Sequence, residues 1–367
     1  MSKKVFLDAP NIGALEKRYL NRAIDAGYVS TVGPFVAEFE RKFARYLGVK
    51  KAVSTQSGTA ALHVALRELG IGKGDEVIVP ALTFVATVNP VVYTGAKPVF
   101  ADVDSKTWNI DPREIEKKIT RRTKAIIPVH LYGNPCDMGA IMKIASRHDL
   151  YVVEDATESL GAKYKGRYTG TFGDMGCFSF NGNKIITTGG GGMVVGRESA
   201  RTDHVKFLVN QARDEEQGYY HPEIGFNYRM TNIESALGLA QLQKLNAFLR
   251  KKEAFNRIYR EMLSDIDCIH FQEGLEFAPN PFWMTAVSFS KPLNIRALQE
   301  ELKRHGVPVR RVFMPMTEFP PYKSARRCFT NSYRIYERSL CLPSSTLNSL
   351  DDIYHACKAI KTLLKAL

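Results

Sequence analysis

The stretch CFSFNGNKIITTGGGGMVV (residues 177–195) holds a lone lysine, Lys184, within a segment of small residues. Asparagines and a glycine precede the lysine, and four consecutive glycines follow it shortly afterwards. Glycine loses more conformational freedom on folding than any other residue, so such a run is costly unless the backbone requires it. Because Lys184 does not lie on an amphipathic helix, it has little reason to be a solvated surface charge. The stretch therefore predicts a tight loop around a buried amine.

The overall composition excludes several classes of protein. The chain has 367 residues, of which 44% are hydrophobic and 24% charged, as in an ordinary soluble globular protein. It contains no apolar run near the roughly 18–20 residues that a membrane span needs, and its start, MSKKVFLDAP (1–10), lacks a secretory signal. Six cysteines without a CxxC pair, and eight histidines without ligand spacing, argue against disulfides and metal. We predict a cytoplasmic protein with no membrane partner and no metal.

A net charge of +13 raises the question of nucleic-acid binding. The basic residues are spread along the chain, and their densest cluster, LRKKEAFNRIYR (249–260), is typical of the solvated face of a helix. No zinc finger or RNP-like aromatic motif accompanies this cluster. The charge therefore favours an anionic small molecule, and no nucleic acid, as the ligand.

Strand and helix patterns alternate through the first half of the chain. KKAVSTQS (50–57) and GKGDEVIVP (72–80) are predicted strands with flanking turns, and GTAALHVALRELG (58–70) between them has helical periodicity. Another apolar run, YVVEDAT (151–157), follows a further helical segment. Continuous apolar strands that alternate with helices predict an α/β fold with a large, mostly parallel sheet covered on both faces.

The pattern changes from Thr231 onwards. Residues 231–264 contain no proline and predict one long helix. Strands and helices then follow one another in the shorter remaining segment, which predicts a small α+β domain. We therefore expect a large α/β domain over 1–240 and a smaller C-terminal domain over 241–367, linked by the long helix.

A predicted anion site lies where the first of these strands turns into a helix. In STQSGTAALH (54–63), Ser57, Gly58 and Thr59 stand at the expected helix start. Serine and threonine cap helices, glycine allows close approach of a ligand, and a helix N-terminus attracts anions. A plain helix cap is the alternative. The motif is neither G-x-G-x-x-G nor a P-loop, which disfavours dinucleotide and nucleoside-triphosphate binding.

Carboxylates stand at the end of the predicted strand YVVEDAT. Glu154 and Asp155 come at the carboxyl end of this strand, and Glu158 follows shortly after. Open α/β sheets bind ligands at the carboxyl ends of their strands, and a buried carboxylate needs a partner. The alternative for Asp155 is the N-cap of a helix starting in ATESLGA (156–162).

Lys184, the anion site and the strand-end carboxylate together match the needs of one cofactor. Burial lowers the pKa of a lysine and makes its neutral amine available to attack a carbonyl. Pyridoxal 5′-phosphate (PLP) needs a lysine for its Schiff base, a carboxylate for its pyridine nitrogen and a loop for its phosphate. We therefore interpret the glycine run as space around a covalently held PLP.

Eight segments, by their order and spacing, also carry a resemblance that covers nearly the whole chain. They are YVSTVGPFVAEFE (28–40), SGTAALHVAL (57–66), PALTFVATVNP (80–90), PVHLYGN (128–134), VVEDATESLGA (152–162), FSFNGNKIITTGGGGM (178–193), GFNYRM (225–230) and CLPSS (341–345). The chain resembles the DegT/StrS-type, PLP-dependent nucleotide-sugar aminotransferases. This resemblance implies the PLP-dependent transferase fold type I, with a large α/β domain and a smaller C-terminal α+β domain.

Matched residue by residue, the family pattern implies roles around the cofactor. Lys184 is the Schiff-base lysine and carries the proton in transamination, and Asp155 pairs with the pyridinium nitrogen. Gly58, Thr59 and Ser179 contact the phosphate. The implied cofactor is PLP, with pyridoxamine 5′-phosphate as its form between the two halves of the reaction.

The resemblance also implies contacts with the cofactor ring and with a second subunit. Phe84 occupies the position that stacks on the ring. Asn227 matches an asparagine that reaches the phosphate of the neighbouring subunit, which implies a homodimer with shared active sites. Glu158 departs from the family, many of whose members carry a glutamine there that bonds the phenolic oxygen of the cofactor. A carboxylate would repel a phenolate unless it held a proton or turned away. The alternative for Glu158 is a surface carboxylate in the first turn of a helix.

The sequence gives fewer signals for the residues that bind the substrate. The residues expected there are Tyr28, Ser30, Asn183 and Arg229. For Arg229, a surface or interface salt bridge is the alternative. His130 and Tyr132 end a predicted strand and face either the ligand or the core.

The implied reaction runs in two halves. L-glutamate, the donor by resemblance, transfers its amino group to the cofactor, and the amine form then reacts with the ketone of a nucleotide-linked sugar. The loop around Lys184 looks most like that of relatives serving the bacillosamine and legionaminic acid pathways. This implies amination at C4 of a UDP-2-acetamido-4-keto-2,6-dideoxyhexose, for bacterial glycan biosynthesis. Amination at C3, and a dTDP or GDP carrier, remain open.

Two alternative functions belong to other classes of protein. A lyase, a desulfurase or an amino-acid aminotransferase would keep the fold and the cofactor, although a desulfurase needs an activated cysteine, and none of the cysteines has such a setting. A non-catalytic regulator would bind PLP without turnover and would bind DNA through its positive charge. The sequence shows no winged-helix or helix-turn-helix pattern, which disfavours the regulator.

Overall fold

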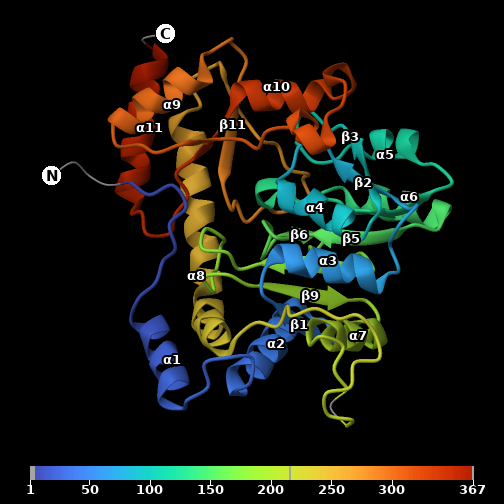
Figure 1. The fold of residues 1–367 in the computed structure, drawn as a ribbon. Helices are drawn as coiled ribbons and strands as arrows, with labels where there is room; N and C mark the ends of the chain where they lie inside the picture. Colours follow the sequence, from blue (N-terminus) through green and yellow to red (C-terminus); the bar gives the residue numbers. More distant parts are fainter. Residues whose placement is uncertain (1–4, 215, 366–367) are drawn as a thin grey trace.

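The computed structural model describes residues 5–214 and 216–365 (Figure 1). Its centre is a seven-stranded sheet in the order β1-β9-β8-β5-β4-β2-β3. In that order the strands are Ala52–Thr55, Gly192–Gly196, Met175–Ser179, Tyr151–Asp155, Thr123–Ile126, Glu76–Pro80 and Lys97–Ala101. Neighbouring strands pair in parallel except at β9, which runs antiparallel to both of its neighbours. The predicted α/β fold with a mostly parallel sheet is confirmed.

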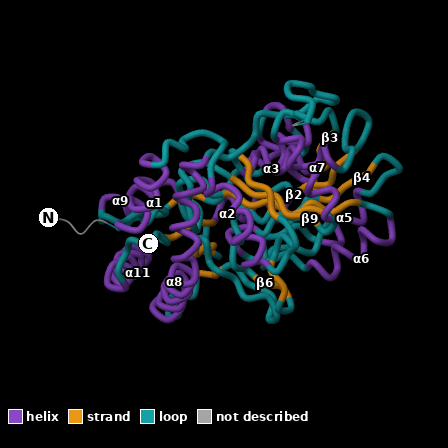
Figure 2. The backbone as a smooth tube through the Cα atoms, turned by 90° about the horizontal axis from the view of Figure 1, so that it is seen from below, coloured by secondary structure: helices purple, strands orange, loops and turns teal. Residues whose placement is uncertain are grey.

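Both faces of the sheet are covered, as its continuous apolar strands require. Val77 and Val79 of β2 pack with α3, α4 and α7, whereas Ile78 between them packs with α5 and α6 on the other face. Figure 2 shows the strands as a layer between helices. The covering helices are α2 (Pro34–Leu47), α3 (Gly58–Glu68), α4 (Val85–Tyr93), α5 (Pro112–Lys118), α6 (Met138–His148) and α7 (Ser199–Val209).

A second, antiparallel sheet lies in the C-terminal part of the chain. Its order is β10-β11-β13-β12, and it shares an apolar core with α9, α11 and the second half of α8. The strands are Ile269–Phe271, Thr285–Phe289, Ser339–Leu342 and Arg310–Arg311, and the helices of this region are α9 (Ile295–Arg304), α10 (Thr330–Arg338) and α11 (Leu350–Lys365). The small hairpin β6–β7 (Lys163–Tyr164 and Arg167–Tyr168) lies apart from both sheets.

The long helix expected over 231–264 is α8, Asn232–Met262. It begins at a capping box, in which the Thr231 hydroxyl accepts from the backbone N–H of Glu234 and the Glu234 carboxylate accepts from that of Thr231. Its first half packs against α1 (Ala14–Asp25) and α2, and its second half against the small sheet. The proposed division at residue 240 falls inside this helix and stays a prediction.

The N-terminal segment lies against the C-terminal part of the chain before it reaches α1. The Asn348 side chain bonds to the backbone of Phe6 at both its N–H and its carbonyl. Ser344 and Ser345 donate hydrogen bonds to the carbonyls of Leu7 and Ala9. Figure 1 shows this blue segment passing beside α11. Residues from the two ends of the sequence are therefore held side by side.

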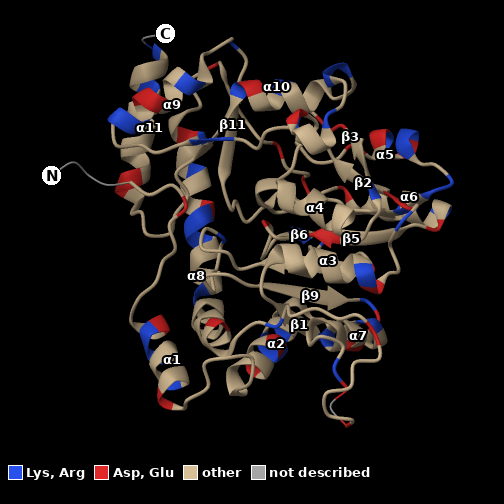
Figure 3. Ribbon diagram, viewed as in Figure 1, with Lys and Arg blue, Asp and Glu red and all other residues tan. Residues whose placement is uncertain are grey.

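Charge and hydropathy give no sign of a membrane or nucleic-acid surface. Lys and Arg are distributed over many helices, interspersed with Asp and Glu, in the view of Figure 3. None of the described helices combines the length and apolar character needed to cross a bilayer. All six cysteines are free thiols. The absence of a nucleic-acid partner stays a prediction.

Candidate active site

One cavity of about 560 Å³ lies at the carboxyl ends of β1, β5 and β8, the size of a small-molecule site. It brings together eight of the residues singled out from the sequence. They are Gly58, Thr59, Phe84, Asp155, Glu158, Ser179, Asn183 and Lys184. Residues more than a hundred positions apart in the sequence thus share one pocket, as expected for the carboxyl edge of a parallel sheet.

The predicted anion site forms one wall of this cavity. The Ser57 hydroxyl accepts a hydrogen bond from the backbone N–H of Ala60 at 3.0 Å and so caps α3. The first N–H groups of a helix have no partners within the helix, so this end presents donors and a positive dipole to an anion. A Cβ placed on Gly58 would lie 2.9 Å from the Ser179 Cβ, so glycine is needed for β8 and α3 to meet here.

The glycine run packs directly behind this wall. Gly191 has a φ of +111°, a conformation that favours glycine. A Cβ on Gly192 would lie 2.5 Å from the carbonyl oxygen of Ser57 and 2.8 Å from the backbone nitrogen of Gly58. Gly190 and Gly191 also line the cavity. The interpretation of the run as space around the cofactor is therefore incomplete, because the backbone contact with the turn at Ser57 and Gly58 also demands glycine.

We expect Gly192→Ala to lower the free energy of unfolding by about 1–3 kcal/mol, the usual cost of overpacking. It should also weaken retention of PLP, since the turn at Ser57 and Gly58 must move. Gly182→Ala is the matched control, because its added Cβ meets nothing closer than 4.0 Å, its φ is not positive and Gly182 does not line the cavity. Denaturant unfolding of the apoprotein and a cofactor titration compare the two variants. Equal behaviour of both would contradict the contact described here.

Asp155 ends β5 with its carboxylate buried and held by hydroxyl groups on both oxygens. The side chain is 3% exposed. Its Oδ2 accepts from the Thr87 hydroxyl at 2.7 Å, and its Oδ1 accepts from the Thr157 hydroxyl at 2.6 Å. The chain after Asp155 forms turns rather than a helix, so the alternative of a helix N-cap is wrong. The hydroxyls hold a negative charge in the cavity wall, where it can pair with a cationic ligand atom.

Lys184 lies in the loop between β8 and β9 with its side chain 13% exposed. Burial lowers the pKa of its amine, and the nearby carboxylates of Glu158 and Asp155 partly oppose that effect. The Nζ atom lies 4.1 Å from the centroid of the Trp283 ring and 3.8 Å from Oε1 of Glu158. A buried amine with a lowered pKa is the kind of lysine that attacks carbonyl groups.

Glu158 is buried at 3% exposure, so the alternative of a surface carboxylate is wrong. Its Oε2 accepts a hydrogen bond from the backbone N–H of Tyr132 at 2.8 Å. Burial raises the pKa of Glu158 to about 7, and the positive charge of Lys184 partly opposes this. Near neutral pH the group can therefore hold a proton and donate a hydrogen bond at a point where a carboxylate would repel a phenolate.

Replacing Glu158 by glutamine should change how the stability of the apoprotein depends on pH. In the folded protein the pKa of this carboxyl is raised from 4.5 to about 7, so between these values the folded state holds more protons than the unfolded chain. The free energy of unfolding therefore falls as the pH rises through this window. Glutamine does not titrate, but it can still accept from Tyr132. We expect the fall to be smaller in Glu158→Gln by about 1–3 kcal/mol, measured by urea unfolding. Identical pH profiles would contradict the raised pKa.

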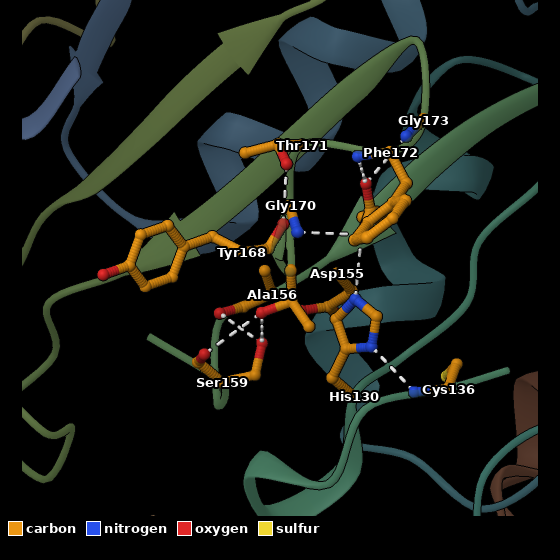
Figure 4. Close-up of polar contacts among 12 residues, drawn as sticks. His130, Cys136, Asp155, Ala156, Ser159, Tyr168, Gly170, Thr171, Phe172 and Gly173 are labelled. Atoms are coloured by element: carbon orange, nitrogen blue, oxygen red, sulfur yellow. Dashed lines mark hydrogen bonds and ion pairs between the residues drawn. The ribbon is translucent and has the colours of Figure 1, made fainter. Parts of the chain in front are cut away.

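Glu154, next to Asp155, belongs to the core because successive side chains of a strand point to opposite faces. Its carboxylate accepts from the backbone N–H groups of Gly170, Phe172 and Gly173 at 2.8, 2.5 and 2.7 Å. His130 Nδ1 accepts from the N–H of Cys136, so its Nε2–H donates to Glu154 at 3.1 Å. Figure 4 labels these partners, His130, Gly170, Phe172 and Gly173. His130 and Tyr132 are 0% and 1% exposed, which places both in the core.

Three residues of the cavity wall lie far along the chain from the other residues of the site and had no sequence signal of their own. Trp283, Arg310 and Phe313 come from the C-terminal part of the chain. The Trp283 Nε1–H donates to the carbonyl oxygen of Asn183 at 2.7 Å, beside Lys184. Phe313 contacts Phe84, with 5.4 Å between the ring centroids. Nothing in the local sequence around these residues distinguishes them from ordinary core positions. They can be identified as cavity residues only from the folded structure.

Four predicted residues do not line the cavity of the single chain. Tyr28 is 45% exposed, and Ser30 and Asn227 are exposed as well. Arg229 donates a hydrogen bond to the Thr31 hydroxyl. The roles of these four residues stay predictions, and for Asn227 exposure is what a contact with a second subunit requires.

The residues of the cavity fit PLP on their own chemistry. The wall at Ser57 and Gly58 offers a helix N-terminus to a phosphate, Lys184 offers a buried amine to an aldehyde, and Asp155 offers a fixed carboxylate to a protonated ring nitrogen. The described residues contain no cluster of histidine, cysteine and acidic side chains suited to a metal ion.

Known proteins resemble this chain in both sequence and structure. Residues 10–361 match the DegT/DnrJ/EryC1/StrS aminotransferase family. The GDP-perosamine synthase of Escherichia coli O157:H7 is 40% identical over 351 residues, or 96% of each chain, and that of Caulobacter vibrioides is 43% identical over 87% of each. The solved PMP form of a Streptococcus pneumoniae protein, provisionally described as a sugar aminotransferase, has a TM-score of 0.95 at 25% identity and covers 99% of this chain and 98% of that one.

Proposed function

Because the chain belongs to the DegT/DnrJ/EryC1/StrS aminotransferase family, we propose that it transfers the amino group of L-glutamate to the C4 ketone of a nucleotide-linked deoxy sugar. It is a PLP-dependent sugar-nucleotide aminotransferase of fold type I. The observation that carries this proposal is the meeting of Lys184, Asp155 and the N-terminus of α3 in one cavity.

Different residues of the chain have different roles in such a reaction. Bound PLP supplies an electron sink. Lys184 provides the amine that holds the cofactor, and once released it moves a proton between the carbon of the donor and that of the cofactor. The carboxylate of Asp155, fixed by Thr87 and Thr157, holds a proton on the ring nitrogen. The Tyr132 N–H keeps Glu158 aimed at the cavity.

Two nucleotides are candidates for the carrier of the sugar. The loop around Lys184 favours the UDP-2-acetamido-4-keto-2,6-dideoxyhexose of the bacillosamine and legionaminic acid pathways. GDP is supported by two relatives at 40% and 43% identity that are named GDP-perosamine synthases. Bacterial glycan biosynthesis is the proposed context, which a 33% identical relative named a spore coat polysaccharide biosynthesis protein supports, and the free thiols of all six cysteines agree with a cytoplasmic setting.

The substrate is tested by loading the enzyme with pyridoxamine 5′-phosphate and mixing it with GDP-, UDP- and dTDP-linked 4-keto and 3-keto sugars. The true acceptor restores the absorbance of the aldehyde form quickly, whereas the other sugars do not. Recovery with amino-acid-derived keto acids and with none of the sugars would overturn the proposal in favour of an amino-acid aminotransferase.

We further propose that the active sites are shared within a homodimer. Asn227 is exposed in the single chain, and Val29, Val32 and Ile224 expose 51%, 65% and 76% of their surfaces. Apolar side chains exposed to this extent are typical of residues covered by a partner. Mixing the inactive variants Lys184→Ala and Asn227→Ala should restore activity, because hybrid dimers contain one intact site. No recovery after verified subunit exchange would contradict shared sites.

A further inference from the structure

Arg310 is the one cationic side chain besides Lys184 among the described residues that line the cavity. It lies on β12 in the C-terminal sheet. Its Nη1 donates to Oδ2 of Asp8 at 2.8 Å. The Arg310 guanidinium and the Lys184 amine both lie against the ring of Trp283, at 5.8 and 4.1 Å from its centroid. Arg310 is therefore a fixed positive charge close to the reactive lysine.

The other end of the guanidinium lacks a partner. Nη2 of Arg310 is buried and has no hydrogen-bond partner among the residues that the structure describes. An unsatisfied buried donor is unfavourable by about 1–3 kcal/mol, and more when it is charged. The planar fork of arginine matches the two oxygens of a carboxylate. Both points indicate that an anionic group of a substrate bonds to Nη2 in the working enzyme.

The two substrates of the proposed reaction place their negative charges differently. In an α-amino acid, a carboxylate is attached to the same carbon as the amino group that must reach the cofactor beside Lys184. In a nucleotide-linked sugar the diphosphate is attached at C1, and the ring separates it from a ketone at C4. A cation next to Lys184 therefore suits the amino donor rather than the sugar nucleotide.

We propose that Arg310 binds the α-carboxylate of the amino donor and so selects the first half of the reaction, an inference that rests on the proposed function. Asp8 is its positioning residue. The Asp8 carboxylate accepts from Nη1 of Arg310 and also from Nδ2 of Asn183 at 3.2 Å. This anchor leaves Nη2 for the donor. During the sugar half of the reaction, Asp8 still balances the positive charge of Arg310.

The test separates the two half-reactions. Arg310→Met keeps much of the apolar stem and removes the charge, and Arg310→Lys keeps the charge and removes the fork. The conversion of the aldehyde form by L-glutamate is followed by stopped-flow absorbance, and the conversion of the amine form is followed with the accepted keto sugar. Binding of glutarate, which carries carboxylates but no amine, is measured by calorimetry on the PLP-loaded enzyme.

We expect Arg310→Met to raise the dissociation constants of glutamate and glutarate by about 10–100-fold, the effect of a charge-assisted hydrogen bond. Arg310→Lys should lie between Arg310→Met and the wild type. The sugar half-reaction should change by less than about threefold. Arg311→Met is the matched control, because the Arg311 guanidinium lies over Tyr336 with 4.0 Å to the ring centroid and does not line the cavity.

Two results would overturn the assignment: equal losses in both half-reactions, or a loss confined to the sugar half. The second result would move the anion site to the diphosphate. If the wild type reacts with glutamate but accepts no nucleotide sugar, only the proposed function fails, and the Arg310 variants still decide the carboxylate site. If the wild type reacts with no α-amino acid, both proposals fall.

Discussion

Lys184→Ala should lose transamination by about 10³-fold or more, because one amine both holds the cofactor and moves the proton. No other lysine among the described residues lines the cavity, so none can replace it. The variant should still bind PLP through the wall at Ser57 and Gly58, but without a covalent bond. Turnover with glutamate, and borohydride reduction followed by peptide mass analysis, measure the two effects separately.

Lys97→Ala serves as the control for this substitution. The Lys97 side chain is 72% exposed and makes only a long contact of 3.8 Å with Glu76. We expect this variant to retain wild-type turnover and the reduced adduct at residue 184. A borohydride adduct on another lysine with none on Lys184, or turnover by Lys184→Ala near the wild-type rate, would remove Lys184 from the mechanism.

Asp155→Ala should lower kcat by about 10²–10⁴-fold, the range for loss of a preorganised charge in a dry site. The carboxylate is 3% exposed and is held by the Thr87 and Thr157 hydroxyls. Asp155→Asn keeps the shape but removes the charge. Because we assign the function to the charge, it should lose nearly as much as the alanine variant. Steady-state kinetics with glutamate and an accepted keto sugar measure both.

Asp203→Asn is the control for Asp155, since its carboxylate is 56% exposed in a surface ion pair with Lys51. Such pairs contribute little, so we expect unchanged kcat. An unchanged rate in Asp155→Asn alone would show that the side chain positions the cofactor by hydrogen bonding and not by charge. An unchanged rate in Asp155→Ala would exclude Asp155 from the mechanism altogether.

The sequence was most informative where local pattern and fold agree. Buried strands such as EVIVP (76–80) have the continuous apolar pattern that is typical of a sheet covered on both faces. The cap at Ser57 and the capping box at Thr231 mark the starts of α3 and α8. The family resemblance assigned the cofactor contact to Asp155 and not to Glu154. The local pattern could not make this choice, because neighbouring residues on a strand differ only in the face of the sheet that they occupy.

What escaped prediction depends on contacts between distant parts of the chain. Arg310 on β12 and Trp283, just before β11, line the cavity, and Asp8 in the N-terminal segment accepts a hydrogen bond from Arg310. Their local sequence has no cap, turn or periodicity that marks a site. The alternative of a helix N-cap at Asp155 was wrong for a local reason, since hydrogen bonds from Thr157 to the Asp155 carboxylate stabilise a turn instead.

The bond between Asp8 and Arg310, 302 positions apart in sequence, has a consequence for biosynthesis. A ribosome adds Arg310 302 residues after Asp8, and domains generally form as the chain emerges. While the residues between them are being synthesised, the Asp8 carboxylate cannot form its ion pair with Arg310. A nascent polypeptide stalled before β12 can contain all seven strands of the large sheet and Lys184, yet it lacks the arginine that we propose binds the amino donor.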